Sequence, residues 1–252
     1  MLNNVENVLI AVLAVAASLL FLIVLNRLWP RERRSEHNDL IGWQLGILGT
    51  TYAVILGFML YTVWTNYGAA EQNVDLEATS LRNIYRLAEG LPEPQHAQIQ
   101  LLCRSYAKVV IDQDWPLMAI NQFPNQSHEI NNTMWKTLMS VKSETQTQVI
   151  AEDHALFELS QLTEHRHTRL LQSAFRIPTV LWFVLIIGGI VTIASASMFG
   201  SANIPLHAIQ VIFFSLLVAL VLLAIADINR PFQGAVHVSS YAFQRAQENM
   251  ID

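Results

Sequence analysis

Charge is scarce in this sequence, and it is unevenly distributed. Only 14% of the 252 residues are charged, whereas soluble globular domains carry about 25%. Asp, Glu, Lys and Arg are absent from three stretches, residues 8–25, 41–70 and 177–226. A helix rises about 1.5 Å per residue, so roughly 20 apolar residues cross a hydrocarbon core about 30 Å thick. The shortage of charge therefore excludes an ordinary soluble protein and predicts membrane-spanning helices.

Other absences narrow the function. The single cysteine, Cys103, excludes an intrachain disulfide. The net charge of -5 provides no basic surface for nucleic acid. The P-loop, Gly-x-Gly-x-x-Gly, Gly-x-Ser-x-Gly and His-Glu-x-x-His motifs are all missing. We therefore predict no enzyme activity, no cofactor and no nucleic-acid partner.

Histidines give only a weak indication of a metal site. His165 and His167 are two residues apart, so their side chains diverge on a helix and cannot both reach one ion. His154 and Glu158 are four apart and could share an ion, but two ligands are weak evidence. Solvated helix positions explain them better, and we predict no metal site.

The apolar runs predict four transmembrane helices. The first spans about residues 8–28, and because no basic stretch precedes it, we interpret it as a retained anchor rather than a signal peptide. The second covers about 40–66. The last run is too long for one crossing and breaks near residues 200–205, which gives a hairpin of helices over 177–199 and 206–228.

The predicted fold is all-α, with four transmembrane helices and a helical polar domain inserted between the second and third. The predicted parts are residues 1–67 for the first two spans, 68–176 for the polar domain, 177–232 for the last two spans and 233–252 for a short tail. Helical spacing of apolar residues, Val149 among them, predicts polar-domain helices over about 69–89, 93–112, 131–142 and 146–175, and the tail contains an amphipathic stretch over 241–250.

A stripe of small residues runs along the second predicted span. Its members are spaced by four, three, four and four residues: Gly42, Gly46, Gly49, Ala53 and Gly57. Small residues let membrane helices approach closely, and glycine lowers helix stability, so this many in one helix indicates a role. Close helix packing and one wall of a water-filled path both remain open.

Two charged pairs flank the predicted spans. Glu71 and Asp75 lie one turn apart just beyond the second span. In a ring of subunits they would form stacked acidic rings, which favour cations; in a single chain they would be a solvated acidic face. Asp227 and Arg230 lie three apart at the end of the fourth span. We favour a salt bridge that ends the helix over a coupling point between the membrane helices and the polar domain.

Three segments resemble the bestrophin-like family of bacterial membrane proteins, which is distantly similar to bestrophin channels. The first comprises Glu36-His37-Asn38-Asp39 and the apolar run over 48–58, the second runs from 77 to 94, and the third is Arg230-Pro231-Phe232-Gln233-Gly234. Bestrophin channels carry an acidic calcium clasp after their Pro-Phe pair. Gln233-Gly234-Ala235 follows here, so the resemblance does not imply calcium gating.

The resemblance implies an oligomeric ion channel, of five subunits, with inorganic ions and the lipid bilayer as its other partners. The second helix would line the pore, with Gly57, Phe58, Tyr61 and Thr65 toward the pore or its constriction and Glu71 and Asp75 as pore-mouth charge. Gly42, Gly46, Gly49 and Ala53 would pack helices, and Asp227, Arg230, Pro231 and Phe232 would provide structural coupling. The alternative is a non-conducting membrane scaffold or envelope-stress sensor whose helical domain binds a partner.

Membrane orientation is indicated inconsistently by the basic residues, which mark the cytoplasmic side of membrane proteins. Four of them place the first loop in the cytoplasm, namely Arg27, Arg31, Arg33 and Arg34. Arg176 and Arg230 instead place the polar domain there. Bestrophins hold their polar domain in the cytoplasm. The resemblance therefore favours a cytoplasmic polar domain on a bacterial inner membrane.

Overall fold

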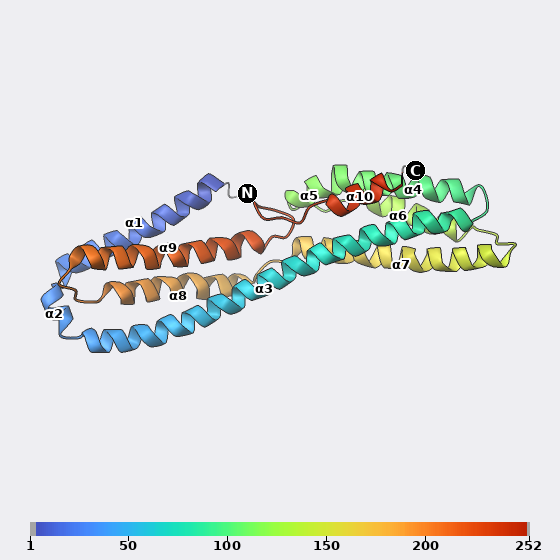
Figure 1. The fold of residues 1–252 in the computed structure, drawn as a ribbon. Coiled ribbons are helices and arrows are strands. Elements are labelled where there is room, and N and C mark those ends of the chain that lie inside the picture. Colours follow the sequence, from blue (N-terminus) through green and yellow to red (C-terminus); the bar gives the residue numbers. More distant parts are fainter. Residues whose placement is uncertain (1–3, 251–252) are drawn as a thin grey trace. The chain divides into compact units, whose positions relative to one another are not determined.

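A computed structural model describes residues 4–250, and in this range every regular element is a helix. The chain divides into two compact units. Of the described residues, 4–65 and 176–229 form the apolar unit, and 66–175 and 230–250 form the polar unit. Figure 1 shows the helices of each unit lying alongside one another.

The apolar unit contains α1 (Asn4–Leu28), the short α2 (Arg31–Ser35), the first part of α3 (Asn38–Leu87), α8 (Thr179–Ser197) and α9 (Ile204–Ile228). Four of these helices are long and apolar enough to cross a membrane, namely α1, α3, α8 and α9. This confirms the prediction of an all-α fold with four apolar spans. Residues 31–35, which lie between the first two predicted spans, form a helix of their own because Pro30 interrupts the backbone hydrogen bonding between α1 and α2.

Close contacts between α3 and α8 depend on two glycines. The Tyr52 hydroxyl donates to the backbone oxygen of Leu185 over 2.8 Å. A Cβ atom on Gly188 would lie 2.8 Å from the Tyr52 ring, and one on Gly189 would lie 2.8 Å from the Tyr52 hydroxyl oxygen. The absence of side chains at both positions therefore creates the space that the tyrosine fills.

The end of α8 and the turn after it are fixed against α2 and the start of α3 by polar contacts. Asn38 donates to the backbone oxygen of Gly200 over 3.1 Å and accepts from its backbone nitrogen over 2.9 Å. The buried Arg34 side chain donates to the Ser197 oxygen over 3.0 Å and to the Asn26 side chain. Only glycine fits at position 200, since a Cβ there would lie 2.7 Å from Ser35 Cα.

The polar unit is a helical bundle with a continuous apolar core. Beyond the remainder of α3 and the 3₁₀ turn Ala88–Gly90, it contains α4 (Gln95–Val109), a π-helical turn (Val110–Asp114), α5 (Trp115–Ala119), α6 (Gln126–Leu138), α7 (Gln146–Ala174) and α10 (Tyr241–Glu248). Its core includes side chains with no exposed surface from α3, α4, α6 and α7: Leu81, Ile84, Ile99, Met134, Leu138, Leu159 and Leu162. Phe232, Val238 and Phe243, from the end of the chain, pack into the same core.

Several predicted helix boundaries within the polar unit are wrong. The helix predicted over 131–142 runs from Gln126 to Leu138, because the chain becomes helical as soon as Pro124 and Asn125 have passed. The helix predicted over 93–112 leaves α-helical geometry after Val109 and continues through a π-helical turn. Val149, predicted on an apolar face, is 46% exposed, since it lies in the first turn of α7.

Candidate functional site

One face of α3 is exposed along its course through the apolar unit. The predicted pore residues lie on it: Phe58 is 69% exposed, Tyr61 is 66% exposed, and Gly57 and Thr65 are exposed as well. Further exposed apolar side chains recur at helical spacing toward the start of α3, namely Trp43, Ile47 and Val54. The described part of the chain thus leaves an aromatic and aliphatic strip of α3 uncovered.

Threonines on this face use their hydroxyl hydrogens within the helix. Thr50 donates to the Gly46 oxygen over 2.8 Å, Thr62 donates to the Phe58 oxygen over 2.8 Å, and Thr65 donates to the Tyr61 oxygen over 3.0 Å. Each of these threonines therefore exposes a methyl group and a hydroxyl oxygen that can still accept a hydrogen bond. This part of α3, over residues 41–65, contains no charged side chain.

Within residues 4–250, the small-residue stripe on α3 is largely unpacked. A Cβ atom on Gly42 would meet Phe199 at 3.5 Å, whereas one on Gly46, Gly49 or Gly57 would have no neighbour within 4 Å. Gly49, Ala53 and Gly57 instead border a cavity of about 290 Å³ whose other wall is formed by α9. Close packing of this stripe stays a prediction, and it would require a neighbour from outside the chain.

The acidic pair after the second span lies on the part of α3 that belongs to the polar unit. Glu71 and Asp75 are both exposed. Glu77, only two residues further along the helix, has no exposed surface. The three carboxyl groups in the polar-unit part of α3 therefore have different environments: two face outward and one is enclosed in the bundle.

Glu77 belongs to a buried polar cluster that sequence reasoning missed. Arg169 Nε donates to Glu77 Oε2 over 2.7 Å, and its terminal nitrogen donates to Asp114 Oδ2 over 2.9 Å. The Tyr106 hydroxyl donates to Glu77 Oε1 over 2.7 Å, and the Arg169 guanidinium lies 5.3 Å from the Trp115 ring centroid. Glu77, Asp114, Arg169 and Tyr106 are all fully buried.

The cluster shifts the protonation equilibria of its members. Burial raises the pKa of the Tyr106 hydroxyl well above its usual range, and the Glu77 carboxylate reinforces this. Burial by itself lowers the pKa of Arg169, but its hydrogen-bonded partner Glu77 outweighs this effect and raises that pKa above its ordinary value. The guanidinium thus stays charged and joins α3, α7 and the π-helical turn.

A sequence signal for this cluster existed. Glu77 falls on the apolar face of α3 between Val74 and Leu81, and Arg169 falls on the inner face of α7 seven residues after Leu162. A charged residue at a core position of an amphipathic helix is seldom buried without a partner of opposite charge. Asp114 gave no such signal, because its inward position results from the π-helical turn.

The residues predicted to provide coupling fall in both units. Asp227 is half-buried near the end of α9 in the apolar unit, and Arg230 is an exposed residue of the polar unit. Pro231 and Phe232 are buried in the polar unit, where Phe232 packs edge-on against Trp115 with 5.8 Å between ring centroids. The coupling role stays a prediction.

No cluster of three or more His, Cys, Asp or Glu side chains that could hold a metal ion occurs within residues 4–250.

The domain model of one family matches residues 12–243, under the description "Bestrophin-like domain". The chain belongs to the bestrophin-like family. This match, together with the four apolar helices, makes the chain an integral membrane protein. No curated protein sequence is significantly similar to it.

Solved structures support the same fold at low sequence identity. A variant of a bacterial bestrophin homologue from Klebsiella pneumoniae is 12% identical to this bestrophin-like chain, with a TM-score of 0.72 and 98% of each chain covered. Another variant of that homologue has a TM-score of 0.73, 12% identity and 97% coverage of each chain. A structure described as a membrane protein, also a variant, has a TM-score of 0.72, 12% identity and 98% coverage of each chain.

Proposed function

We propose that this bestrophin-like protein forms a homo-oligomeric ion channel whose pore is lined by α3. The observation that supports this most is the exposed strip on α3, from Trp43 through Phe58 and Tyr61 to Thr65. A single chain has no charged side chain between residues 41 and 70 with which to form a private ion pathway. A ring of α3 helices, five by resemblance, would enclose a path instead.

The proposed constriction is aromatic. Phe58 and Tyr61 lie one turn apart on the same exposed face, so each subunit would add two aromatic rings at neighbouring levels. Narrow apolar constrictions gate ion flow by excluding water. Replacement of both side chains by alanine is therefore expected to raise the open probability.

Acidic side chains beyond the constriction would determine the ion selectivity. Glu71 and Asp75 are exposed on α3, and residues 68–176 carry 13 acidic against 9 basic residues. Carboxylates around a narrow mouth concentrate cations and repel anions. Facing bulk water instead, they would be screened within about 10 Å at 0.1 M salt and would have little effect.

Reversal potentials in planar bilayers under a potassium chloride gradient test both the conduction and the selectivity. The wild type should show a cation-selective potential that shifts toward zero in Glu71→Gln/Asp75→Asn. A matched control, Glu144→Gln/Asp153→Asn, removes the same charge from exposed positions elsewhere in the polar unit and should leave the potential unchanged. Anion selectivity that the first double variant does not alter would refute the proposed site but not the channel.

A second candidate function is a non-conducting scaffold or envelope-stress sensor. Exposed apolar side chains on the polar unit favour it, since Phe123 is 67%, Met139 is 71% and Phe157 is 61% exposed, and such surfaces attract protein partners. Absence of current at every voltage, pH and membrane tension would support this function over the channel.

Assembly and orientation have separate tests. Light scattering in mild detergent should show that the protein is a homo-oligomer. Gly49→Leu should disrupt the oligomer, because the leucine side chain would keep a neighbouring helix from approaching the small-residue stripe closely. We further propose that the polar unit lies in the cytoplasm at the bacterial inner membrane. A fluorescent-protein fusion after Asp252 should then fluoresce, whereas an alkaline phosphatase fusion at the same point should be inactive.

A further inference from the structure

The segment that follows α9 packs directly into the core of the polar unit. Phe232 comes four residues after the end of α9 and is 3% exposed, and its ring lies edge-on against Trp115 with 5.8 Å between ring centroids. The next residue, Gln233, donates from its side-chain amide to the Met118 backbone oxygen over 3.0 Å. The chain therefore attaches to α5 within five residues of the end of α9.

The backbone of this segment is fixed in a turn beside Trp115. The Val238 nitrogen donates to the Pro231 oxygen over 2.7 Å. Gly234, within the turn, has a φ of 88°, a conformation that residues with a Cβ atom seldom adopt. The Trp115 indole nitrogen donates to the Val238 oxygen over 3.0 Å. The segment thus holds Trp115 at two points, the ring through Phe232 and the indole N–H through Val238.

Trp115 also contacts the buried ionic cluster. The Arg169 guanidinium carbon lies 5.3 Å from the Trp115 ring centroid, within the range of a cation–π contact. Arg169 donates two hydrogen bonds to the Glu77 carboxylate, over 2.7 and 3.1 Å. Glu77 belongs to α3, so these contacts join the segment after α9 to α3. We refer to the side chains of Phe232, Trp115, Arg169 and Glu77 as the Trp115 link.

The Trp115 link is suited to transmit a displacement. Phe232, Arg169 and Glu77 are buried, and Trp115 is partly buried against the same core, so in a close-packed interior none of them can move far without displacing the next. Trp115 directly follows the π-helical turn, and π-helical turns are rare and often lie at functional sites. Because α3 is one uninterrupted helix, Glu77 shares it with the proposed constriction.

We propose that Trp115 is a positioning residue for the pore helix. Through Arg169 and Glu77 it joins α3 to the segment after α9, and in this way it keeps the aromatic constriction narrow. Chains of packed side chains and hydrogen bonds carry energetic coupling between distant parts of a protein. This inference rests on the proposed channel function and adds a means of regulation to it, because a movement of the segment after α9 would reach α3 through the link.

Single-channel recording in planar bilayers tests the proposal by comparing Trp115→Leu with Trp135→Leu in the full-length protein. Both tryptophans are partly buried against the core of the polar unit, and both donate an indole hydrogen bond, which Trp135 makes to the Thr163 hydroxyl over 3.1 Å. Trp135 thereby joins α6 to α7. Trp115→Leu should raise the open probability about fivefold, a change typical of a modest coupling energy, whereas Trp135→Leu should leave it at the wild-type level.

Two measurements separate positioning from a general loss of packing. Cys103 has no exposed surface, so its modification by a thiol reagent reports opening of the bundle, and its rate should be similar in Trp115→Leu and Trp135→Leu. Trp115→Phe keeps an aromatic ring beside Phe232 and Arg169 and should bring the open probability back close to that of the wild type.

A double variant tests whether the contacts act in series. Phe232→Leu should also raise the open probability, and Phe232→Leu/Trp115→Leu should raise it no further than either single change, because both interrupt the same link. Effects that multiply in the double variant would overturn the proposal. If gel filtration shows that Trp115→Leu does not fold, Phe232→Leu is compared with Trp135→Leu instead.

The remaining outcomes distinguish this inference from the channel itself. Wild-type current with equal open probability in Trp115→Leu and Trp135→Leu would refute the positioning role and leave the channel standing. A raised open probability accompanied by faster Cys103 modification would mean that the bundle has loosened, which also refutes the role. Absence of current from the wild type would refute the proposed channel and the inference together.

Discussion

The helices of the two units are held together by different kinds of contact. In the polar unit, leucines and isoleucines are fully buried around an ionic cluster centred on Arg169. In the apolar unit many large apolar side chains are exposed: Leu13 is 57%, Phe183 is 61% and Phe213 is 66% exposed. Its buried helix contacts include small or hydroxyl-bearing residues such as Gly188, Ser18 and Tyr52.

The difference follows from the solvent of each unit. In water, burial of apolar surface drives association at about 25 cal/mol per Å². In lipid the surroundings are as apolar as leucine, so close packing and hydrogen bonds between helices supply the attraction instead. The same residue types therefore have opposite roles in the two units, and four substitutions test how far this contrast holds.

The largest effect is expected from Arg169→Met in the polar unit. This change leaves the buried carboxyl groups of Glu77 and Asp114 without a cation, and removing one partner of a buried ionic cluster costs about 3–5 kcal/mol. The readout is the rate of thiol modification at Cys103 in the full-length protein. Cys103 has no exposed surface, and burial raises its pKa, so it reacts only after the bundle opens.

Arg104→Met is the control for that substitution. Arg104 lies on an exposed position of α4, where its guanidinium lies 5.4 Å from the Tyr85 ring centroid and donates to the Tyr85 hydroxyl over 2.5 Å. Contacts of this kind contribute about 0.5–1.5 kcal/mol each, less than a fully buried ionic cluster. Similar Cys103 reactivity in both variants would show that the buried cluster does not hold the polar unit together.

A smaller loss is expected from Gly188→Ala in the apolar unit. The new Cβ would lie 2.8 Å from the Tyr52 ring, and overpacking of this kind costs about 1–3 kcal/mol. Gly68→Ala on α3 is the control, because Gly68 lies outside the small-residue stripe, its Cβ would meet no described atom within 4 Å, and alanine favours a helix by up to about 1 kcal/mol. Thermal unfolding in detergent should separate the two, and equal stability would contradict the role assigned to Gly188.

Alkaline pH should reveal the buried tyrosine of the polar unit. The pKa of Tyr106 is higher in the folded state than in the unfolded state. The stabilisation of the folded protein by the Tyr106 hydroxyl is therefore fully present below about pH 10 and decreases as the pH rises from there toward the folded pKa. The stability difference between wild type and Tyr106→Phe should narrow by up to about 1.4 kcal/mol per pH unit above pH 10.

Denaturant unfolding at several pH values measures this difference. Arginine is charged in an unfolded chain at pH 10 to 11, and the raised pKa of Arg169 keeps it charged in the folded protein as well, so this residue adds no pH dependence there. A difference that stays constant with pH would mean that the Tyr106 hydroxyl ionises normally in the folded protein.

The smallest effect is expected from Ser18→Ala, which removes the hydroxyl contact between α1 and α9. Hydrogen bonds between membrane helices contribute about 0.6 kcal/mol on average. The variant should therefore remain folded, while the distance distribution between spin labels on α1 and α9, measured by double electron–electron resonance, becomes broader. Ser201→Ala, at the α8–α9 turn, should leave those distances unchanged.

The sequence by itself determined the parts that depend on composition and periodicity. Charge-free runs over 41–70 and 177–226 define the spans, because a charged side chain in lipid is costly whatever surrounds it. The apolar spacing of Val74, Leu81 and Ile84 marks the buried side of α3 in the polar unit. The exposure of Phe58 and Tyr61 follows only from the tertiary structure, because an aromatic residue in a membrane helix can face lipid, a partner helix or a pore.

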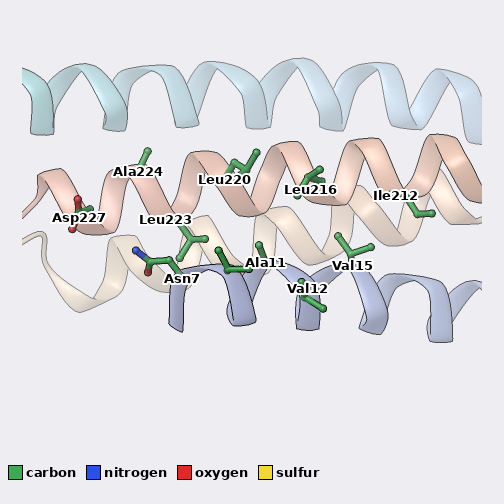
Figure 2. Close-up of a pocket in the computed structure, with 11 residues that line it drawn as sticks. Asn7, Ala11, Val12, Val15, Ile212, Leu216, Leu220, Leu223, Ala224 and Asp227 are labelled. Atoms are coloured by element: carbon green, nitrogen blue, oxygen red, sulfur yellow. The ribbon is translucent and has the colours of Figure 1, made fainter. Parts of the chain in front are cut away.

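Only the tertiary structure decided which polar groups meet. Arg169 lies 92 positions after Glu77 and 55 after Asp114, and no local pattern links residues that far apart. The π-helical turn turns Asp114 inward, and Gly188 and Gly189 are used because Tyr52 from another helix fills their space. The cavity of about 560 Å³ that α1 and α9 line together (Figure 2) likewise arises from the joint course of two helices, whereas each helix alone is an ordinary apolar span.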